Sequence, residues 1–553
     1  MRIVSATIRQ GPSSLRTGDE TGERKGGRHA WVAAVLLLGG LVAPLAAAGA
    51  TSLGLPAGGV LPAGQGPSSN LLMGDQSSFA GSSGGWVGVK AAVSWVAAPS
   101  YSGAGALSVS PQSATGASVW SGNGSGGAAG GDTQAVPGDV YAGGAMVDSV
   151  SGEVIAQPAL AFFSAGGGFL GGLWGQVMAL DPGRWTALAP VVGIAPSGAA
   201  WVVLGIGTNG STAGSRMDVD AASLRSSPGG SPAVDGPLSV SGNKILQSDG
   251  SPVVLRGIVL YGLEASANPP IMSENELLQA KAWGANMIRL PLGEQLWLSS
   301  SCQYDSNYES AVAGMVRSIT SLGMVALLDL HFNSVSPCGP AGQQPMADYP
   351  GSVEFWQQVS AQFGSNPLVA FDLYNEPHGL TTAQWLHGGP VNVAPSPPFE
   401  AAGMQQLYDA VRSSGTSDLV VVSGNDWATS FPGALVKGYN IAYGVHSYSC
   451  PFAPPPRCGS PDPYSPPFLA SWAKSAAGVP VIVSEFGWPS TLSGTFDANV
   501  IAFAQARGWG WSVFAWDGST SGIFDLLASV PKLGSYEPAA SGMPVLAALS
   551  GLS

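Results

Sequence analysis

The chain has 553 residues, a formal net charge of −13 and only 10% charged side chains, whereas glycine (79) and proline (43) are abundant. This length exceeds what one compact core organises, so two or three domains are expected. Nucleic acids and anionic membranes bind clustered lysine and arginine, and 21 basic against 34 acidic residues argue against both kinds of partner. The low fraction of charged residues suits an extracellular or acid-exposed protein. The negative net charge favours a neutral or cationic partner.

The first fifty residues have the pattern of an export signal. Basic residues precede the apolar run 31–38, and small residues follow at 46–50. We expect residues 1–50 to be a signal peptide and the protein to be secreted, with no integral membrane domain after cleavage. The charged leader is longer than usual, so an uncleaved anchor or a start further along is the alternative. Pro44, which follows the run and precedes the small residues, disfavours a stable spanning helix.

Two changes of composition divide the rest of the chain. Residues 51–68 lack periodicity and predict a flexible leader. Residues 69–226 carry short alternating runs between glycine-rich turns, for example 86–89 and 200–204, which predict an antiparallel β-sandwich. Residues 227–237 are rich in Gly, Ser and Pro and predict a linker.

The chain has four cysteines, all in predicted loops of the C-terminal half: Cys302, Cys338, Cys450 and Cys458. An exported protein can oxidise them, and a bond between Cys450 and Cys458 would close one loop. Four free thiols are the alternative. No spacing among them indicates a metal site.

Residues 238–553 alternate short apolar strands with amphipathic helical patterns, which is typical of a parallel sheet with crossover helices. Eight strands in about 310 residues predict a closed (β/α)8 barrel, so the fold class is α/β with an N-terminal all-β domain. An open doubly wound sheet is the alternative, but the glycine-rich phosphate turn after its first strand is missing. The predicted strands are residues 253–261, 287–290, 324–330, 369–374, 419–423, 442–445, 481–484 and 511–515.

Polar residues close most of these apolar strands, and in such a barrel the carboxyl ends of the strands converge on one mouth. A single polar strand end is more often a structural hydrogen-bonding group than a catalyst, but six ends directed at one point are harder to explain in that way. The residues are Arg289, His331, Asn375, Glu376, His446, Tyr448, Glu485 and Trp516.

Glu376 and Glu485 form the candidate catalytic pair. They close the fourth and seventh strands, which lie across the ring from each other and permit the carboxyl separation of about 5–5.5 Å found in retaining glycosidases. One carboxyl group would protonate the leaving oxygen while the other attacks the anomeric carbon. Arg289 and Tyr448 could keep the nucleophile ionised, and Trp516 offers a flat face for a sugar ring. Taken alone, Glu376 could instead be a salt-bridged barrel residue.

Residues 238–553 resemble glycoside hydrolase family 5, the cellulase-like branch of the retaining (β/α)8 hydrolases. By that resemblance Glu376 is the general acid/base and Glu485 the nucleophile, while Arg289, His331, Asn375, His446, Tyr448 and Trp516 line the subsite of the sugar being cleaved, with Asn375 bonded to its 2-hydroxyl. The loops 388–398 and 450–467 depart from the family, which leaves the substrate open. The matching motifs are residues 242–245, 255–257, Asp329-Leu330-His331, Asn375-Glu376-Pro377, His446-Ser447-Tyr448 and Ser484-Glu485-Phe486-Gly487.

Residues 69–226 more faintly resemble a jelly-roll carbohydrate-binding module of the family 4, 9 and 16 type, through 70–72, 136–141 and 217–220. The resemblance implies that a structural calcium ion could lie near Asp218 or Asp220, although the sequence has no calcium loop. Candidate sugar platforms are Trp95, Tyr101, Trp120 and Trp174, each of which could equally be a core residue.

These observations predict a secreted, monomeric, retaining endo-β-1,4-glycanase that acts on cellulose or another β-glucan and needs no catalytic metal or other cofactor. A β-mannanase, or an exo-glycosidase or transglycosidase with the same residues, is the first alternative. A non-catalytic polysaccharide-binding protein that keeps the barrel as a scaffold is the second.

Overall fold

The computed structural model describes residues 69–97, 100–123, 132–175, 177–208, 210–269, 274–448, 467–487, 495–517, 525–527, 538–539 and 541–552. The predicted signal peptide, the leader and the Cys450–Cys458 loop lie outside these residues. No helix within these ranges is both long and apolar enough to cross a bilayer.

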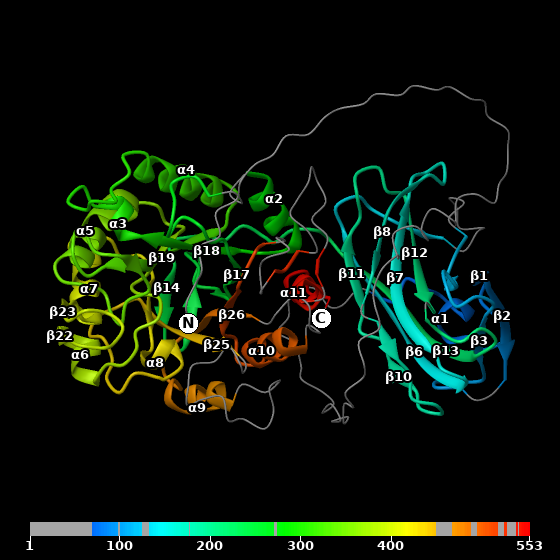
Figure 1. The fold of residues 1–553 in the computed structure, drawn as a ribbon. Coiled ribbons are helices and arrows are strands. Elements are labelled where there is room, and N and C mark those ends of the chain that lie inside the picture. Colours follow the sequence, from blue (N-terminus) through cyan, green and yellow to red (C-terminus); the bar gives the residue numbers. More distant parts are fainter. Residues whose placement is uncertain are drawn as a thin grey trace, which may run out of the picture. The chain divides into compact units, whose positions relative to one another are not determined.

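The N-terminal part contains two antiparallel β-sheets (Figure 1). The first runs in the order β1 (Val87–Val89), β4 (Ser118–Trp120), β12 (Trp201–Gly207), β7 (Ile155–Phe163) and β8 (Phe169–Trp174), with β5 (Thr133–Gln134) beside β12 and β9 (Met178–Ala179) beside β7. The second runs β10 (Thr186–Ala187), β6 (Val140–Ser151), β13 (Arg216–Ser227), β3 (Ala106–Pro111) and β2 (Ala91–Val96), with β11 (Val191–Ile194) on β6. A short helix, α1 (Asp75–Ser78), precedes them.

Period-two alternation produces the core of this part. Along β12, Val202, Leu204 and Ile206 join one apolar cluster with residues of both sheets. Gly205 and Gly207 alternate with them, and a side chain at either glycine would collide with the ring of Trp120 or Trp174. The runs 86–89 and 200–204, predicted as strands, correspond to β1 and β12.

Eight parallel strands close into a barrel, because β18 pairs with both β17 and β19, and β17 also pairs with β27. The predicted barrel is confirmed, and an open sheet is excluded by this closure. In ring order the strands are β17 (Arg256–Val259), β18 (Met287–Gly293), β19 (Val325–Ser334), β21 (Val369–Asp372), β24 (Val420–Ser423), β25 (Ile441–Tyr448), β26 (Val481–Gly487) and β27 (Gly510–Val513).

A helical segment follows every strand of the barrel, and longer ones such as α4 bury one face. In α4, Tyr308, Val312, Val316 and Ile319 recur at helical spacing and are buried. The helices are α2 (Glu274–Trp283), α3 (Glu294–Trp297), α4 (Tyr308–Ser321), α5 (Gly351–Phe363), α6 (Thr382–His387), α7 (Met404–Arg412), α8 (Asn425–Ala428), α9 (Pro467–Ser475), α10 (Thr495–Gln505) and α11 (Gly542–Leu549).

Short antiparallel strands are added to the barrel outside its eight-stranded ring. The sheet of β14 (Ser239–Ser241), β15 (Lys244–Leu246) and β16 (Pro252–Val253) places Ile245 against Leu255 and Met287, so it covers the apolar interior near the strand starts. β20 (Ala341–Gly342) pairs with the end of β19. Residues 388–398, predicted as a loop, contain β22 (Gly389–Val391), which pairs with β23 (Phe399–Ala401).

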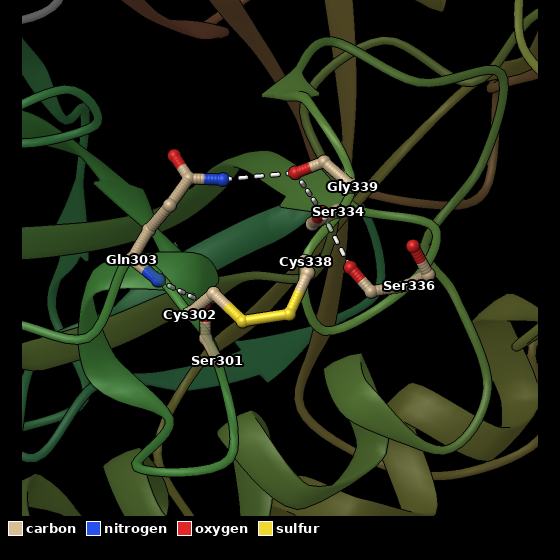
Figure 2. Close-up of a disulfide and its surroundings, with 7 residues drawn as sticks. All are labelled: Ser301, Cys302, Gln303, Ser334, Ser336, Cys338 and Gly339. Carbon is tan, nitrogen blue, oxygen red and sulfur yellow. Dashed lines mark hydrogen bonds between the residues drawn. A yellow bond between two sulfur atoms is a disulfide. The ribbon is translucent and has the colours of Figure 1, made fainter.

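A disulfide joins Cys302, in the loop after α3, to Cys338, in the loop after β19 (Figure 2). The backbone N–H of Cys302 also donates to the carbonyl of Pro337, and the side chain of Gln303 donates to the carbonyl of Gly339. These contacts connect two loops that follow neighbouring strands. The alternative of four free thiols is therefore excluded for this pair.

Candidate active site

The inward face of the barrel changes from apolar to polar along its strands. Side chains in a strand alternate with period two, so β18 turns Met287 and then Arg289 inward, and β19 turns Leu327 and then Asp329 inward. Met287 and Leu327 belong to the apolar interior cluster. Arg289 and Asp329 form a fully buried ion pair at 3.1 Å. A polar layer therefore lies directly above the apolar one, toward the carboxyl ends of the strands.

Arg289 is held within the barrel wall rather than at its rim. The predicted second strand, residues 287–290, stops one position after Arg289, whereas β18 continues to Gly293. The side chain is fully buried, and its Nε donates to Asp372 at 3.0 Å while Nη1 donates to Glu485 at 2.7 Å. Nη2 donates to the amide oxygen of Asn375 at 2.8 Å. One rigid guanidinium thus fixes side chains from three other strands or strand ends.

The surroundings of Glu485 stabilise its ionised form. Burial alone would raise the pKa of Glu485, but the charges of His446 and Arg289 outweigh burial and lower this pKa to about 2. The Tyr448 hydroxyl donates to Oε1 of Glu485 at 2.6 Å and contributes in the same direction. A carboxylate that stays ionised and hydrogen-bonded is suited to act as a nucleophile.

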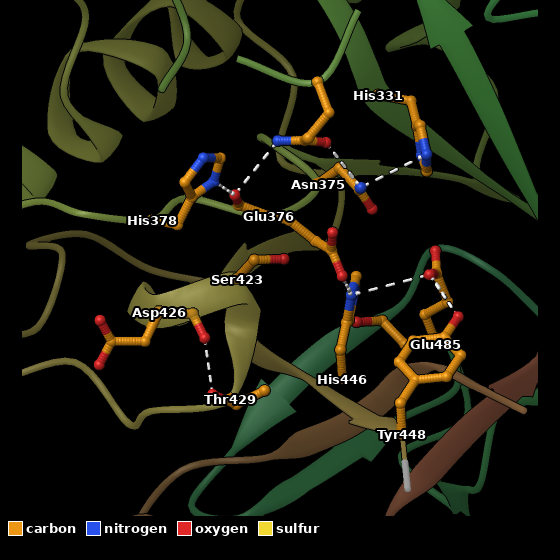
Figure 3. A network of polar contacts seen from close by, with 12 residues as sticks. His331, Asn375, Glu376, His378, Ser423, Asp426, Thr429, His446, Tyr448 and Glu485 are labelled. Atoms are coloured by element: carbon orange, nitrogen blue, oxygen red, sulfur yellow. Dashed lines mark hydrogen bonds and ion pairs between the residues drawn. The ribbon is translucent and has the colours of Figure 1, made fainter. Parts of the chain in front are cut away.

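Glu376 faces Glu485 across a small gap (Figure 3). One carboxylate oxygen of each, together with a ring nitrogen of His446, lie within 4.8 Å of one another. His446 Nδ1 is 2.9 Å from Glu376 Oε1 and 3.9 Å from Glu485 Oε1. Because the side chain of Glu376 is 18% exposed and that of Glu485 is 8% exposed, the two carboxylates meet at the edge of the buried layer.

His331 and Asn375 occupy the side of the site toward β19. His331 Nδ1 lies 2.6 Å from Asp329 Oδ2. Burial alone would lower the pKa of His331, but the Asp329 carboxylate outweighs burial and raises this pKa to about 9. Asn375 donates from Nδ2 to Gln343 Oε1 at 2.8 Å, while its amide oxygen accepts from Arg289. The structure therefore brings together seven of the eight side chains that the sequence singles out.

Trp516 does not join them. Its side chain is fully buried, and its ring packs edge-on against Trp283 of α2 with ring centroids 4.8 Å apart. The expectation that Trp516 presents a flat face to a sugar is therefore not met. The chain leaves β27 at Val513 and turns the Trp516 ring into the apolar layer between strands and helices.

Two other aromatic pairs lie beyond the carboxyl ends of barrel strands. Tyr261 and Phe514 follow β17 and β27, with ring centroids 5.5 Å apart, and both are half-buried. His378 and Trp427 are stacked, with centroids 3.6 Å apart and planes 8° apart. His378 Nδ1 is 2.8 Å from the carbonyl oxygen of Glu376, so this stack adjoins the candidate acid.

The sequence analysis did not identify the residues that hold the candidate catalytic side chains in place. Asp372 lies three positions before Asn375, is fully buried and accepts from Arg289. Burial raises the pKa of Asp372 to about 7, against the opposing effect of Arg289. The alternation of β21 was a usable signal, because Asp372 continues the inward series of the buried Ala370. Gln343 lies in an irregular segment and carries no comparable signal.

The carboxylates of Glu376 and Glu485 with His446 are also the one group of described residues close enough to hold a metal ion. The guanidinium of Arg289 already provides positive charge at 2.7 Å from Glu485. In the N-terminal sheets, Asp218 binds Arg216 through two hydrogen bonds, and Asp220 accepts from the backbone N–H groups of Tyr101, Ser102 and Ala221. These carboxylates face N–H donors, so their surroundings do not fit the calcium ion that the resemblance implies.

The chain is similar to several known proteins. A family model described as cellulase (glycosyl hydrolase family 5) matches residues 246–520. An endoglucanase from Paenibacillus polymyxa is 26% identical over 350 residues, which cover 53% of this chain and 83% of the relative. Endoglucanase EG-II from Hypocrea jecorina is 28% identical over 165 residues, which cover 29% of this chain and 34% of the relative.

Among solved structures, a β-glucanase from Saccharophagus degradans in complex with cellotetraose is 19% identical to this chain. The match covers 59% of this chain and 97% of that one, with a TM-score of 0.45.

Proposed function

We propose that the protein is a secreted, retaining endo-β-1,4-glycanase that hydrolyses a β-linked polysaccharide by double displacement. The match of residues 246–520 to the glycosyl hydrolase family 5 model supports this proposal. The spacing of Glu376 and Glu485 is the observation that carries the proposal. Carboxylate oxygens within 4.8 Å agree with the separation of about 5–5.5 Å in retaining enzymes and leave no room for the water that an inverting enzyme places between them.

In the first step, Glu485 attacks the anomeric carbon, and Glu376 transfers its proton to the glycosidic oxygen as that bond breaks. The aglycone leaves as an alcohol, and the sugar remains as an ester on Glu485. In the second step, Glu376 takes a proton from water, which attacks the same carbon and releases Glu485. Arg289 and Tyr448 hold Glu485 ionised and oriented for the attack.

Substrate binding is proposed for the residues around this pair. Asn375 lies beside Glu376, and its amide oxygen already accepts a hydrogen bond from Arg289. Its Nδ2 group can donate to a sugar 2-hydroxyl in place of its hydrogen bond to Gln343. His331 and His446 complete the polar wall. The aromatic floor is assigned to Tyr261 with Phe514 and to the His378–Trp427 stack rather than to Trp516.

The finer assignments of the rest of the chain belong to the same proposal. Residues 1–50 would be the export signal, residues 69–226 a polysaccharide-binding sandwich of jelly-roll type, and residues 227–237 the linker to the catalytic domain. β-Mannan is the alternative substrate to β-glucan. Reducing-sugar release across β-glucans, xylan and mannans separates these alternatives.

The proposal is tested with Glu376→Ala. Removal of the general acid should reduce turnover of polysaccharide by about 10²–10⁴-fold. An aryl glycoside with a good leaving group should lose less activity in forming the intermediate, and azide should restore its turnover by replacing water. Glu354→Ala, an exposed glutamate on α5, is the matched control and should behave as wild type. Polysaccharide cleavage unaffected by Glu376→Ala, or a product of inverted configuration by NMR, would overturn the proposal.

A further inference from the structure

We propose that Tyr101 and Trp185 form a polysaccharide-binding platform on the N-terminal sandwich, an inference that rests on the proposed function of the whole chain. The two rings have centroids 6.0 Å apart and planes at 55°. Tyr101 is 53% exposed, and Trp185 is partly exposed. The residues belong to different loops, Tyr101 between β2 and β3 and Trp185 directly before β10.

Backbone hydrogen bonds to the second sheet hold each loop in position. Asp220 of β13 is fully buried, and its Oδ2 accepts from the backbone N–H of Tyr101 at 2.9 Å and of Ser102 at 2.6 Å. The Trp185 loop is held by β6, because the backbone N–H of Gly183 donates to the carbonyl of Ser149 at 2.9 Å and Thr186, directly after Trp185, pairs with Val147.

The two anchoring strands are neighbours, because β6 and β13 pair along their length (Figure 1). The bulge in β13 after Asp220 includes Ala221 at φ 47°, and its N–H donates to Asp220 Oδ1. The sheet therefore fixes both loops, so that the aromatic pair is organised before a ligand arrives. Preorganised side chains lose little conformational entropy on binding, as a recognition site requires.

The other aromatic candidates on the sandwich serve its own packing. Trp120 is 6% exposed. Trp174 lies against Gly207, where a side chain would collide with its ring. Trp95 is 37% exposed, but its Nε1 donates to the carbonyl of Phe79 and its ring lies on Gly105.

The chemistry of the Tyr101–Trp185 pair fits a neutral sugar chain. Aromatic faces accept the C–H faces of pyranose rings, and the tyrosine hydroxyl and indole N–H provide polar contacts at their edges. Asp181 and Arg184 beside Trp185 are exposed and form a loose ion pair at 3.9 Å, so they can reach hydroxyl groups without adding net charge. A platform joined to the catalytic domain would raise the local concentration of that domain on an insoluble polymer.

The test measures binding isotherms of the full chain on insoluble cellulose in the cold, together with hydrolysis of a soluble β-glucan. Tyr101→Ala and Trp185→Ala should each weaken binding to cellulose by about tenfold and leave kcat/KM on the soluble glucan unchanged. Trp185→Phe should keep most of the binding, because it retains a stacking face. Val136→Ser, which changes another exposed apolar residue of the sandwich (52% exposed), is the control and should bind as wild type.

Each result decides the proposal. Unchanged isotherms in both alanine variants, or a wild-type chain that hydrolyses soluble glucan but does not bind cellulose, would overturn the platform while the catalytic proposal stands. A wild-type chain without hydrolytic activity on any β-glucan or mannan would instead overturn the proposed function. A change of oligomeric state in the variants by gel filtration would identify the pair as a contact between copies and also overturn the platform.

Discussion

Replacing Tyr448 by phenylalanine isolates one interaction of the nucleophile. The change removes a hydroxyl that donates to Glu485 Oε1 at 2.6 Å and leaves the ring in place. A hydrogen bond to a charged group contributes about 1.5–3 kcal/mol, and one pKa unit corresponds to about 1.4 kcal/mol. Because the bond stabilises the ionised form, its loss should raise the pKa of Glu485 from about 2 to about 3–4.

The assay is the pH dependence of kcat/KM on an aryl β-glycoside from pH 2 to pH 8. The nucleophile must be ionised, so activity rises with pH through the pKa of Glu485 in the free enzyme. The acidic limb of the Tyr448→Phe variant should therefore lie about one to two pH units above that of the wild type.

Tyr443→Phe is the matched control. Tyr443 lies on the same strand, β25, is buried, and its hydroxyl accepts from the backbone N–H of Val436 instead of bonding to a carboxylate. This variant should lose some stability while its acidic limb stays where it is in the wild type. Coincident acidic limbs in wild type and Tyr448→Phe would refute the role assigned to Tyr448.

Three further predictions concern stability. Cys302→Ser opens a disulfide that spans 36 positions, so the free energy of unfolding should fall by about 4 kcal/mol in denaturant titrations. Reductant should lower the wild-type midpoint more than that of the variant, and equal midpoints of the two oxidised proteins would contradict the prediction. Burial, followed by the neighbouring Asp348 carboxylate, raises the pKa of Glu294 well above 4.5. The folded state therefore retains a proton that the unfolded state releases, and wild-type stability should fall as pH rises above about 4.5. Glu294→Gln should flatten the curve of Tm against pH, and parallel curves for the two proteins would exclude Glu294 as the cause of the fall. Trp516→Ala should lower the free energy of unfolding by about 3–5 kcal/mol; a variant with unchanged stability but a raised KM would restore the sugar-platform interpretation.

The sequence alone determined the architecture of the catalytic domain. Short apolar runs and helical spacing are local properties, and all eight predicted strands are present in the ring. The carboxyl-end rule then placed Glu376 and Glu485 at one mouth, because closure of a parallel barrel leaves few other positions for residues that end its strands.

The tertiary structure decided depth and neighbourhood, which depend on the complete ring and its helices. The sequence places Trp516 at the end of a strand and so at the rim of the barrel, yet the turn after β27 directs its ring into the core. Asp372 is an ordinary strand residue until closure places it 3.0 Å from Arg289. The pairing of Tyr101 with Trp185 joins residues far apart in the chain, and only the adjacency of β6 and β13 brings their loops together. Local spacing encodes elements, whereas the distances between side chains of different elements arise only when those elements pack.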